Sequence, residues 1–430
     1  MYRDLKQCST WTVAVMLICA GQLLAAEPPT VKITVLSLRD YGWEPLDPVH
    51  PHEIDTVRRG SIAVDHKNRV LVGFAVRERS GLVTRDQPAL SFHIVRLSPD
   101  GKTDLSLSLP TNGWRSNSLY LSDTDQIIVR ANDSLQLLQS NSEPANMGKG
   151  SWKVIAPCGW RCQITQSPSR RTLLLDTWDV DPPLTVIDTT QLPTVRRCAK
   201  TSHEAHSITD KFAYSSGQTR ADILNYFSGK TPRAEVHLYR WPLCEYEHLA
   251  EIPVPIRGRY TVMNDRFFIV NADTKAASDV DGDLEVISSE GRVKFRQAMV
   301  KHDHWDAFFV PIRSSERGDR IAVDILTTRG GNRTLDISSH VTARRIAVYD
   351  IEAGKELASV PVSAKHKYRF EFDLSPDGRR LAILEDDTVK VVDLEEARTG
   401  EKPTERADTV DLKDGTLRLQ VPIPASKPKQ

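Results

Sequence analysis

The sequence lacks the charge imbalance and the catalytic motifs that identify many nucleic-acid-binding proteins and enzymes. Its 430 residues carry 57 basic and 57 acidic side chains, so the formal net charge is zero. Nucleic-acid-binding proteins usually concentrate a basic excess on one surface, and this balance argues against nucleic acid as a partner. The sequence contains no Gly-x-Ser-x-Gly motif, which argues against the nucleophile elbow of an α/β-hydrolase domain.

Long apolar runs are also scarce, and the one that stands out lies at the N-terminus. Arg3 and Lys6 precede the apolar segment Trp11 to Ala20, and the small residues Ala25 and Ala26 follow. This order predicts a secretory signal peptide over residues 1–26, and therefore a secreted or periplasmic protein without a membrane span after cleavage. Two alternatives stay open: an uncleaved anchor, although the run is short for a span of about 20 residues, and lipidation at Cys19.

Cysteine is sparse, and only four cysteines follow the predicted cleavage site: Cys158, Cys162, Cys198 and Cys244. An even number in an oxidising compartment favours disulfides over buried thiols. We predict at least one disulfide involving Cys158, Cys162 or Cys198, because these residues border consecutive repeat units. Cys244 lies nearer a turn within a unit, and we expect it to stay free. The spacing of Cys158 and Cys162 also suits zinc, but the other pair lacks such spacing.

What the sequence does contain is a pattern of short strands separated by turns. Phe372 to Leu394 reads as three strands in a row, with a Ser375-Pro-Asp-Gly378 turn after the first and an Asp386-Asp387 turn after the second. Proline fixes φ at the second turn position, and glycine tolerates the positive φ that closes the turn. Such a unit buries little apolar surface alone, so it needs copies beside it.

This segment closely resembles the WD40-like repeat of bacterial TolB-type propellers, which also occurs in the propellers of prolyl-oligopeptidase-like enzymes. The shared pattern is an apolar strand, Ser-Pro-Asp-Gly-Arg-Arg, and then Leu-Ala-Ile-Leu, and it covers about twenty residues. Leu97 to Lys102 is a partial echo in the outer part of its unit. The resemblance implies an all-β propeller that binds a protein or an envelope component. It says little about activity, because propellers host many unrelated functions.

Similar units recur along the chain at spacings of about 40 to 60 residues, near the length of a propeller blade. No stretch shows sustained helical periodicity, so we expect little helix. The pattern predicts one all-β domain over residues 27–421, a seven-bladed β-propeller, followed by a disordered tail at 422–430. Six or eight blades are the alternatives, because long insertions interrupt three units. The inner strands of the seven units begin near Ser61, Leu119, Gln163, His206, Tyr260, Ala307 and Phe372.

The ends of the chain should close the ring. Val31 to Leu38 is a strong strand ahead of the first unit, and we expect it to pair with the seventh unit as its outer strand. Leu417 to Val421 competes for the same place, and both segments can add to one sheet.

Two polar segments that lead into inner strands are the candidate binding residues. His302, His304 and Asp306 precede the sixth inner strand, and His203 and His206 precede the fourth. Loops of this kind lie near the mouth of a propeller's central channel, where ligands usually bind, and function tends to reside on loops held by a rigid scaffold. The competing interpretation is a set of solvated polar loops.

Metal sites and cofactors are not expected. Acidic residues alternate between Asp279 and Glu285, which suits calcium, but Gly282 suits a plain hairpin turn better. These observations favour an exported, monomeric, non-catalytic propeller that acts as a binding or scaffold module. The alternative is a hydrolase or lyase that uses His and Asp side chains at the channel mouth.

Overall fold

The computed structural model describes most of the strands and turns of the chain. The predicted signal peptide and C-terminal tail lie outside the described residues. Within that part of the chain, no helix has the length and apolar character needed to cross a membrane. The described residues are 32–43, 60–77, 90–111, 118–139, 151–159, 162–176, 184–192, 194–198, 207–217, 224, 228, 236–245, 250–256, 259–264, 266–270, 283–288, 291–298, 300–301, 304–329, 341–364, 371–394 and 417–419.

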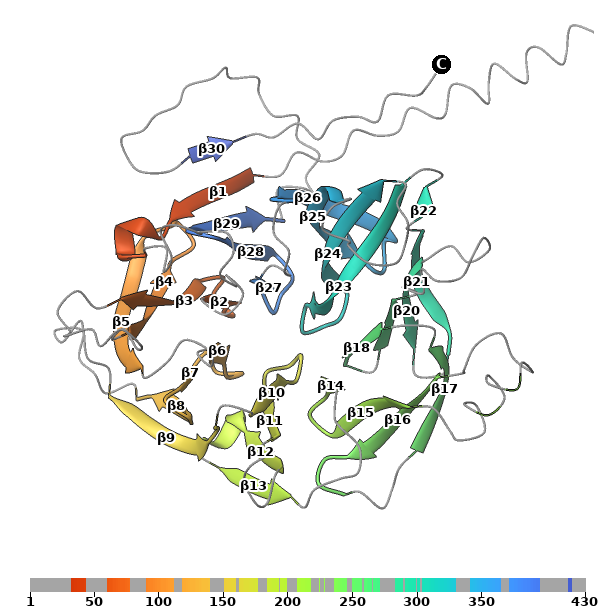
Figure 1. Ribbon diagram of the computed structural model, residues 1–430, viewed down its shortest axis with the longest axis horizontal. Coiled ribbons are helices and arrows are strands. Elements are labelled where there is room, and N and C mark those ends of the chain that lie inside the picture. The colour runs from red at the N-terminus through yellow and green to blue at the C-terminus, as the bar shows by residue number, and fades with distance from the viewer. Residues whose placement is uncertain are drawn as a thin grey trace, which may run out of the picture.

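The described strands form seven antiparallel sheets around a common axis (Figure 1). Neighbouring strands within each sheet are mostly consecutive in the chain. The first four sheets comprise β2 (Gly60–Val64), β3 (Val70–Arg77), β4 (Leu90–Leu97) and β5 (Thr103–Thr111); β6 (Ser118–Leu121), β7 (Ile127–Ala131), β8 (Ser134–Leu138) and β9 (Trp152–Pro157); β10 (Gln163–Gln166), β11 (Thr172–Asp176), β12 (Leu184–Asp188) and β13 (Val195–Cys198); and β14 (Ser207–Ile208), β15 (Phe212–Gly217), β16 (Val236–Pro242) and β17 (Ala250–Ile256).

The remaining three sheets complete the ring. Two short 3-10 helices, Arg39–Tyr41 and Thr189–Gln191, lie in connecting segments. The sheets comprise β18 (Arg259–Met263), β19 (Arg266–Val270), β20 (Asp283–Ser288) and β21 (Val293–Ala298); β22 (Val300–Lys301), β23 (His304–Ser314), β24 (Arg320–Arg329), β25 (Val341–Asp350) and β26 (Lys355–Val362); and β27 (Glu371–Leu374), β28 (Arg380–Glu385), β29 (Thr388–Asp393), β1 (Lys32–Ser37) and β30 (Leu417–Leu419).

This arrangement is an all-β propeller, as the sequence predicts. The strands nearest the axis are β2, β6, β10, β14, β18, β23 and β27, and most of them contact the next inner strand around the ring. The chain enters each inner strand from a connecting loop. It then passes through a tight turn into the second strand of the same sheet. We call the side carrying the tight turns the turn face, and the opposite side the approach face.

The two ends of the described chain meet in one sheet. β1 pairs antiparallel with β29, with Ile33 opposite Val392, and its other edge pairs with β30, with Ile33 opposite Leu419. The prediction that both terminal segments add to the same sheet is therefore correct. These pairings cover edges that would otherwise stay open to other chains.

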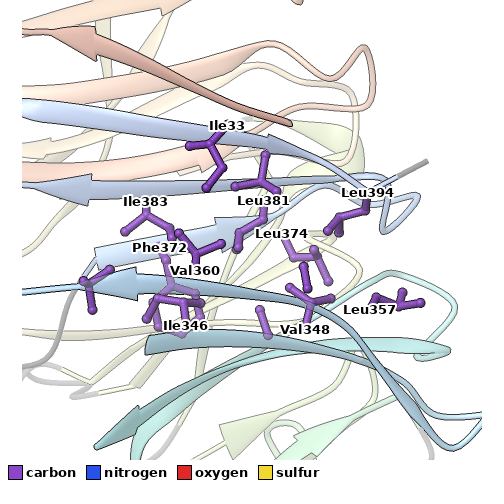
Figure 2. Packing of buried hydrophobic residues seen from close by; sticks show 14 residues of the cluster. Ile33, Ile346, Val348, Leu357, Val360, Phe372, Leu374, Leu381, Ile383 and Leu394 are labelled. Carbon is purple, nitrogen blue, oxygen red and sulfur yellow. The ribbon is translucent and has the colours of Figure 1, made fainter. Parts of the chain in front are cut away.

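The hydrophobic core lies between adjacent sheets. Figure 2 shows the largest cluster, where Ile346 and Val348 of β25 face Phe372 of β27 and Ile383 of β28. Burying each such side chain contributes about 1.5–3 kcal/mol. Ile33 of β1 joins this cluster, so the N-terminal strand stabilises the same interface as the C-terminal sheet.

The predicted Ser375–Gly378 turn forms, and its serine explains why it does. The Ser375 hydroxyl accepts hydrogen bonds from the backbone N–H groups of Arg379 and Arg380, at 3.0 and 2.9 Å. Gly378 has a φ of 70°, and a Cβ there would lie 2.8 Å from Cδ of Arg320 in the neighbouring sheet. Serines at the corresponding turns of three other sheets accept backbone hydrogen bonds in the same way: Ser122, Ser167 and Ser315.

Candidate functional site

The structure describes only two of the five candidate binding residues. His203, His206 and His302 lie outside the described residues. His304 and Asp306 lie in β23, where their backbones pair with Arg329 and Thr327 of β24. The structure thus places two of the five residues on one strand and leaves their proximity to the other three a prediction.

The sheet that carries His304 and Asp306 is longer than its neighbours. β23 has 11 residues, whereas the inner strands β2 and β18 have 5 each. β23 ends at Ser314, beside its turn-face turn, so its additional residues lie at the approach face. At a rise of roughly 3.3 Å per residue they extend the strand by about 20 Å. We call this part of β23, β24 and β25 the sheet extension.

The register of β22 shows which end of the extension is its tip. Lys301 pairs with His304 and Val300 pairs with Trp305, so β22 and β23 form a hairpin. β23 runs toward the turn face, and its first residue, His304, therefore lies at the tip. A β-bulge between Phe309 and Arg313 separates the extension from the lower part of the strand. Bulges bend a strand and re-aim its side chains, and they are frequent beside functional sites.

A buried ion pair lies within the elongated sheet. Arg344 of β25 donates hydrogen bonds to both carboxylate oxygens of Asp324 in β24, at 2.9 Å from Nε and 2.5 Å from Nη2. Both side chains are essentially inaccessible to solvent. The planar fork of arginine matches the carboxylate, so the pair fixes the relative position of the two strands.

Another group of charged side chains lies near the turn face, where the inner strands of different sheets meet. Arg170 comes from the turn between β10 and β11 and reaches across the axis. It donates to the Val64 carbonyl in β2 at 2.6 Å and to Oδ2 of Asp373 in β27 at 2.9 Å. The Val64 N–H donates to the same Asp373 oxygen at 2.9 Å. One arginine thus connects sheets on opposite sides of the ring.

Arg313, from a third sheet, lies beside the same aspartate. Arg313 of β23 donates from Nε to the Phe372 carbonyl at 3.1 Å, and Nε lies 3.9 Å from Oδ1 of Asp373. Tyr120 lies in β6, across the ring from β23, and its hydroxyl accepts a hydrogen bond from the Ser118 hydroxyl at 3.1 Å. Burial raises the pKa of Tyr120, so its hydroxyl stays protonated and can donate a hydrogen bond.

The turn face itself consists of contacts between sheets. His66 Nδ1 lies 2.8 Å from Asp125 in the next sheet, and Arg320 donates to the Gly378 carbonyl at 2.6 Å. Arg380 donates to the Asn68 carbonyl at 2.7 Å and pairs with Asp393. These side chains are occupied in holding the ring together, which supports a structural role for the turn face.

Both disulfides of the structure flank the β10–β13 sheet. Cys158, after β9, bonds Cys162, before β10, and Cys198, at the end of β13, bonds Cys244, after β16. The Cα–Cα distances are 5.2 and 5.1 Å, within the range for disulfides. The expectation of at least one disulfide is confirmed, and all three candidate cysteines participate.

The expectation that Cys244 stays free is wrong. Cys244 does lie in a turn within a sheet, with a φ of 69°. That turn packs on the neighbouring sheet, where Cys244 belongs to the same apolar cluster as Cys198 and Trp241. The place of a cysteine within its own repeat unit therefore does not predict which residues of the neighbouring unit it contacts.

No constellation typical of a metal centre is found in the described ranges, where no group of three or more His, Cys, Asp or Glu side chains converges. The acidic segment considered for calcium lies mostly outside those ranges, since only Asp283 and Glu285 of it belong to a described strand, β20.

Comparison with known proteins adds little beyond the fold. No protein-family model and no curated protein matches the sequence. Hsv2 from Kluyvelomyces marxianus is 11% identical, with 76% of this chain and 90% of that chain covered and a TM-score of 0.38. Hsv2 from Kluyveromyces lactis is 8% identical, with 76% and 91% covered and a TM-score of 0.37. A chain of the mitotic checkpoint complex is 14% identical, with 64% and 87% covered and a TM-score of 0.31. The propeller assignment rests on the strand topology of this chain.

Proposed function

We propose that this chain is an exported, non-catalytic β-propeller that binds a protein or an envelope component through its approach face. The observation that carries the proposal is the sheet extension, which projects His304 and Asp306 beyond the neighbouring inner strands. Rigid strands that present polar residues beyond a scaffold suit recognition of a partner. The turn face is occupied by contacts between sheets, which leaves the approach face as the better candidate surface.

Export is supported by two features that are independent of each other. The N-terminal sequence has the order of a secretory signal over residues 1–26. Two disulfides join four cysteines, and disulfides persist mainly in oxidising compartments. The resemblance of Phe372 to Leu394 to TolB-type repeats adds a bacterial envelope setting to the proposal.

The domain organisation belongs to the same proposal. We infer a single propeller over residues 27–421, with a tail at 422–430. The seven sheets support a count of seven blades, in which the last blade gains β1 and β30 as additional outer strands. The protein acts as a monomer, since a closed ring leaves few strand edges for pairing between copies.

Site-specific photo-crosslinking tests the docking surface. Ala343 is exposed on β25 within the sheet extension, and Arg317 is exposed on the turn face of the same sheet. A photoreactive phenylalanine at position 343 should form a crosslinked product with an envelope component in an envelope extract, and the same group at position 317 should not. Equal crosslinking from both positions, or crosslinking only from position 317, would refute the approach face as the docking surface.

A hydrolase or lyase is the second candidate, and it depends on His and Asp side chains meeting at the channel mouth. Replacing both His302 and His304 with alanine distinguishes the two functions. A binding module should lose affinity for its partner with nearly unchanged melting temperature. Loss of a turnover activity on envelope-derived substrates would favour the enzyme instead.

A further inference from the structure

Arg313 holds a guanidinium group at the ring axis with its terminal nitrogens unoccupied. Nε donates to the Phe372 carbonyl, and Asp373 lies 3.9 Å away. In the part of the chain that the structure describes, no hydrogen bond or ion pair involves Nη1 or Nη2 of Arg313. The side chain is 37% exposed, so these donors face solvent. Arginine presents two parallel N–H donors that match a carboxylate.

The backbone beside Arg313 is irregular. The β-bulge between Phe309 and Arg313 ends at Arg313, which resumes regular pairing opposite Ala322. A bulge of this kind changes the direction of the residues beside it. The hydrogen bond from Nε to β27 then fixes the guanidinium, so little conformational entropy remains to be lost when a ligand binds.

The turn-face side of Arg313 is occupied by a neighbouring side chain. Toward the turn face, the axis is spanned by Arg170, whose side chain is 10% exposed and contacts both Val64 and Asp373. We therefore expect a ligand to arrive from the approach face, where the sheet extension lies.

We propose that Arg313 binds a carboxylate of an acidic, extended peptide segment that enters the ring axis from the approach face. The inference rests on the proposed function, because the peptide belongs to the partner that docks there. A single carboxylate fits better than a phosphate, since the nearby carboxylate of Asp373 repels a dianion more strongly. The fork of Arg313 supplies the paired donors.

Fluorescence anisotropy with two matched probes tests this site directly. One probe is a labelled peptide of Glu-Gly repeats, and the other has Gln in place of each Glu. At low salt the wild-type protein should bind the Glu peptide about tenfold more tightly than the Gln peptide, as one charge-assisted bidentate contact allows. Arg313→Gln should abolish this preference, and Arg313→Lys should retain part of it, because lysine keeps the charge without the fork.

Arg317→Gln is the matched control, since it removes the same charge from the turn face of the same sheet. It should leave binding of the Glu peptide unchanged. An undiminished preference in Arg313→Gln would overturn the proposal. Binding of inorganic phosphate or of phosphatidylglycerol vesicles through Arg313, without binding of the Glu peptide, would also overturn it.

A measurement on the wild-type protein does not depend on the stability of any variant. Nitrogen-15 NMR of arginine-labelled protein should show the Nη resonances of Arg313 shifting as the Glu peptide is added, and an unshifted Arg313 would contradict the site. Failure of this inference is separable from failure of the proposed function. Crosslinking from position 343 with no effect of Arg313→Gln would leave the docking face intact and remove only the carboxylate site.

Discussion

The guanidinium of Arg344 and the carboxylate of Asp324 form a bidentate ion pair that water does not reach. The two residues lie on adjacent strands of the elongated sheet. Taking such charges out of water is costly, and the cost is offset only while both partners are present. The intact pair therefore contributes little net free energy to folding. Removal of one partner, in contrast, destabilises the protein strongly, because the other charge stays buried.

Asp324→Asn should destabilise the protein by about 3–5 kcal/mol, because Arg344 is then a buried charge without its carboxylate. Urea denaturation monitored by circular dichroism measures this difference. The double variant Asp324→Leu with Arg344→Met should recover most of the loss, since two apolar side chains replace the pair. A double variant as unstable as Asp324→Asn would show that packing, and not the orphaned charge, sets the cost.

Arg170→Ala should cost about 2–4 kcal/mol, because it removes charge-assisted hydrogen bonds to Val64 and leaves Asp373 without its closest cation. Arg171→Ala is a close control, as its side chain is 55% exposed and lies 3.8 Å from Asp123. That exposed pair should contribute no more than about 0.5–1 kcal/mol. Comparable losses in both variants would mean that the contact across the axis does not stabilise the ring.

Removing the two disulfides should have unequal effects. The chain-entropy model assigns about 4 kcal/mol to the Cys198–Cys244 crosslink and about 2 kcal/mol to the Cys158–Cys162 crosslink, because their sequence separations are 46 and 4 residues. Thermal unfolding of the two Cys→Ser double variants measures the difference. A larger drop in melting temperature for the Cys158–Cys162 variant would show that the entropy of loop closure does not determine how much each disulfide stabilises the protein.

Asp377 should make the turn face sensitive to acid. Burial raises the pKa of this carboxyl, but hydrogen bonds from Ser375, the Arg379 N–H and Asn68 lower it more, so the net shift is downward. A pKa lowered by folding stabilises the protein above the unfolded value of 3.8, and this contribution is lost as the pH falls below it toward the folded pKa. The stability difference between wild type and Asp377→Asn should therefore be constant near neutral pH and shrink below about pH 4. A difference that stays constant down to pH 2 in urea titrations would contradict this role.

The repeat architecture could be predicted because its signals are local. Ser375 and Gly378 lie within one turn, and their residue types follow from the backbone conformation that the turn requires. The pairing of β1 with β29 was also predictable, since a strong terminal strand without a partner in its own unit needs one elsewhere. In both cases the relevant chemistry is contained in a few consecutive residues.

The contacts across the ring could not be predicted in the same way. Nothing near Arg170 in the sequence indicates that its side chain reaches Asp373, because that distance depends on the diameter and closure of the ring. Cys244 illustrates the same point, as its partner is decided by how two sheets pack. Arg313 follows a bulge that contains Pro311, a residue type that marks bulges in strands, but Pro311 does not indicate what the side chain after it contacts.

The pairing of β1 with β29 also constrains how the protein is made. Two strands from nearly opposite ends of the described chain must meet before the last sheet is complete, and contacts so distant in sequence form slowly. During synthesis, a nascent chain that does not yet include β29 has an unpaired β1 and an incomplete ring. Such an intermediate exposes strand edges to other chains. The interval before closure is therefore when this protein most needs the help of chaperones.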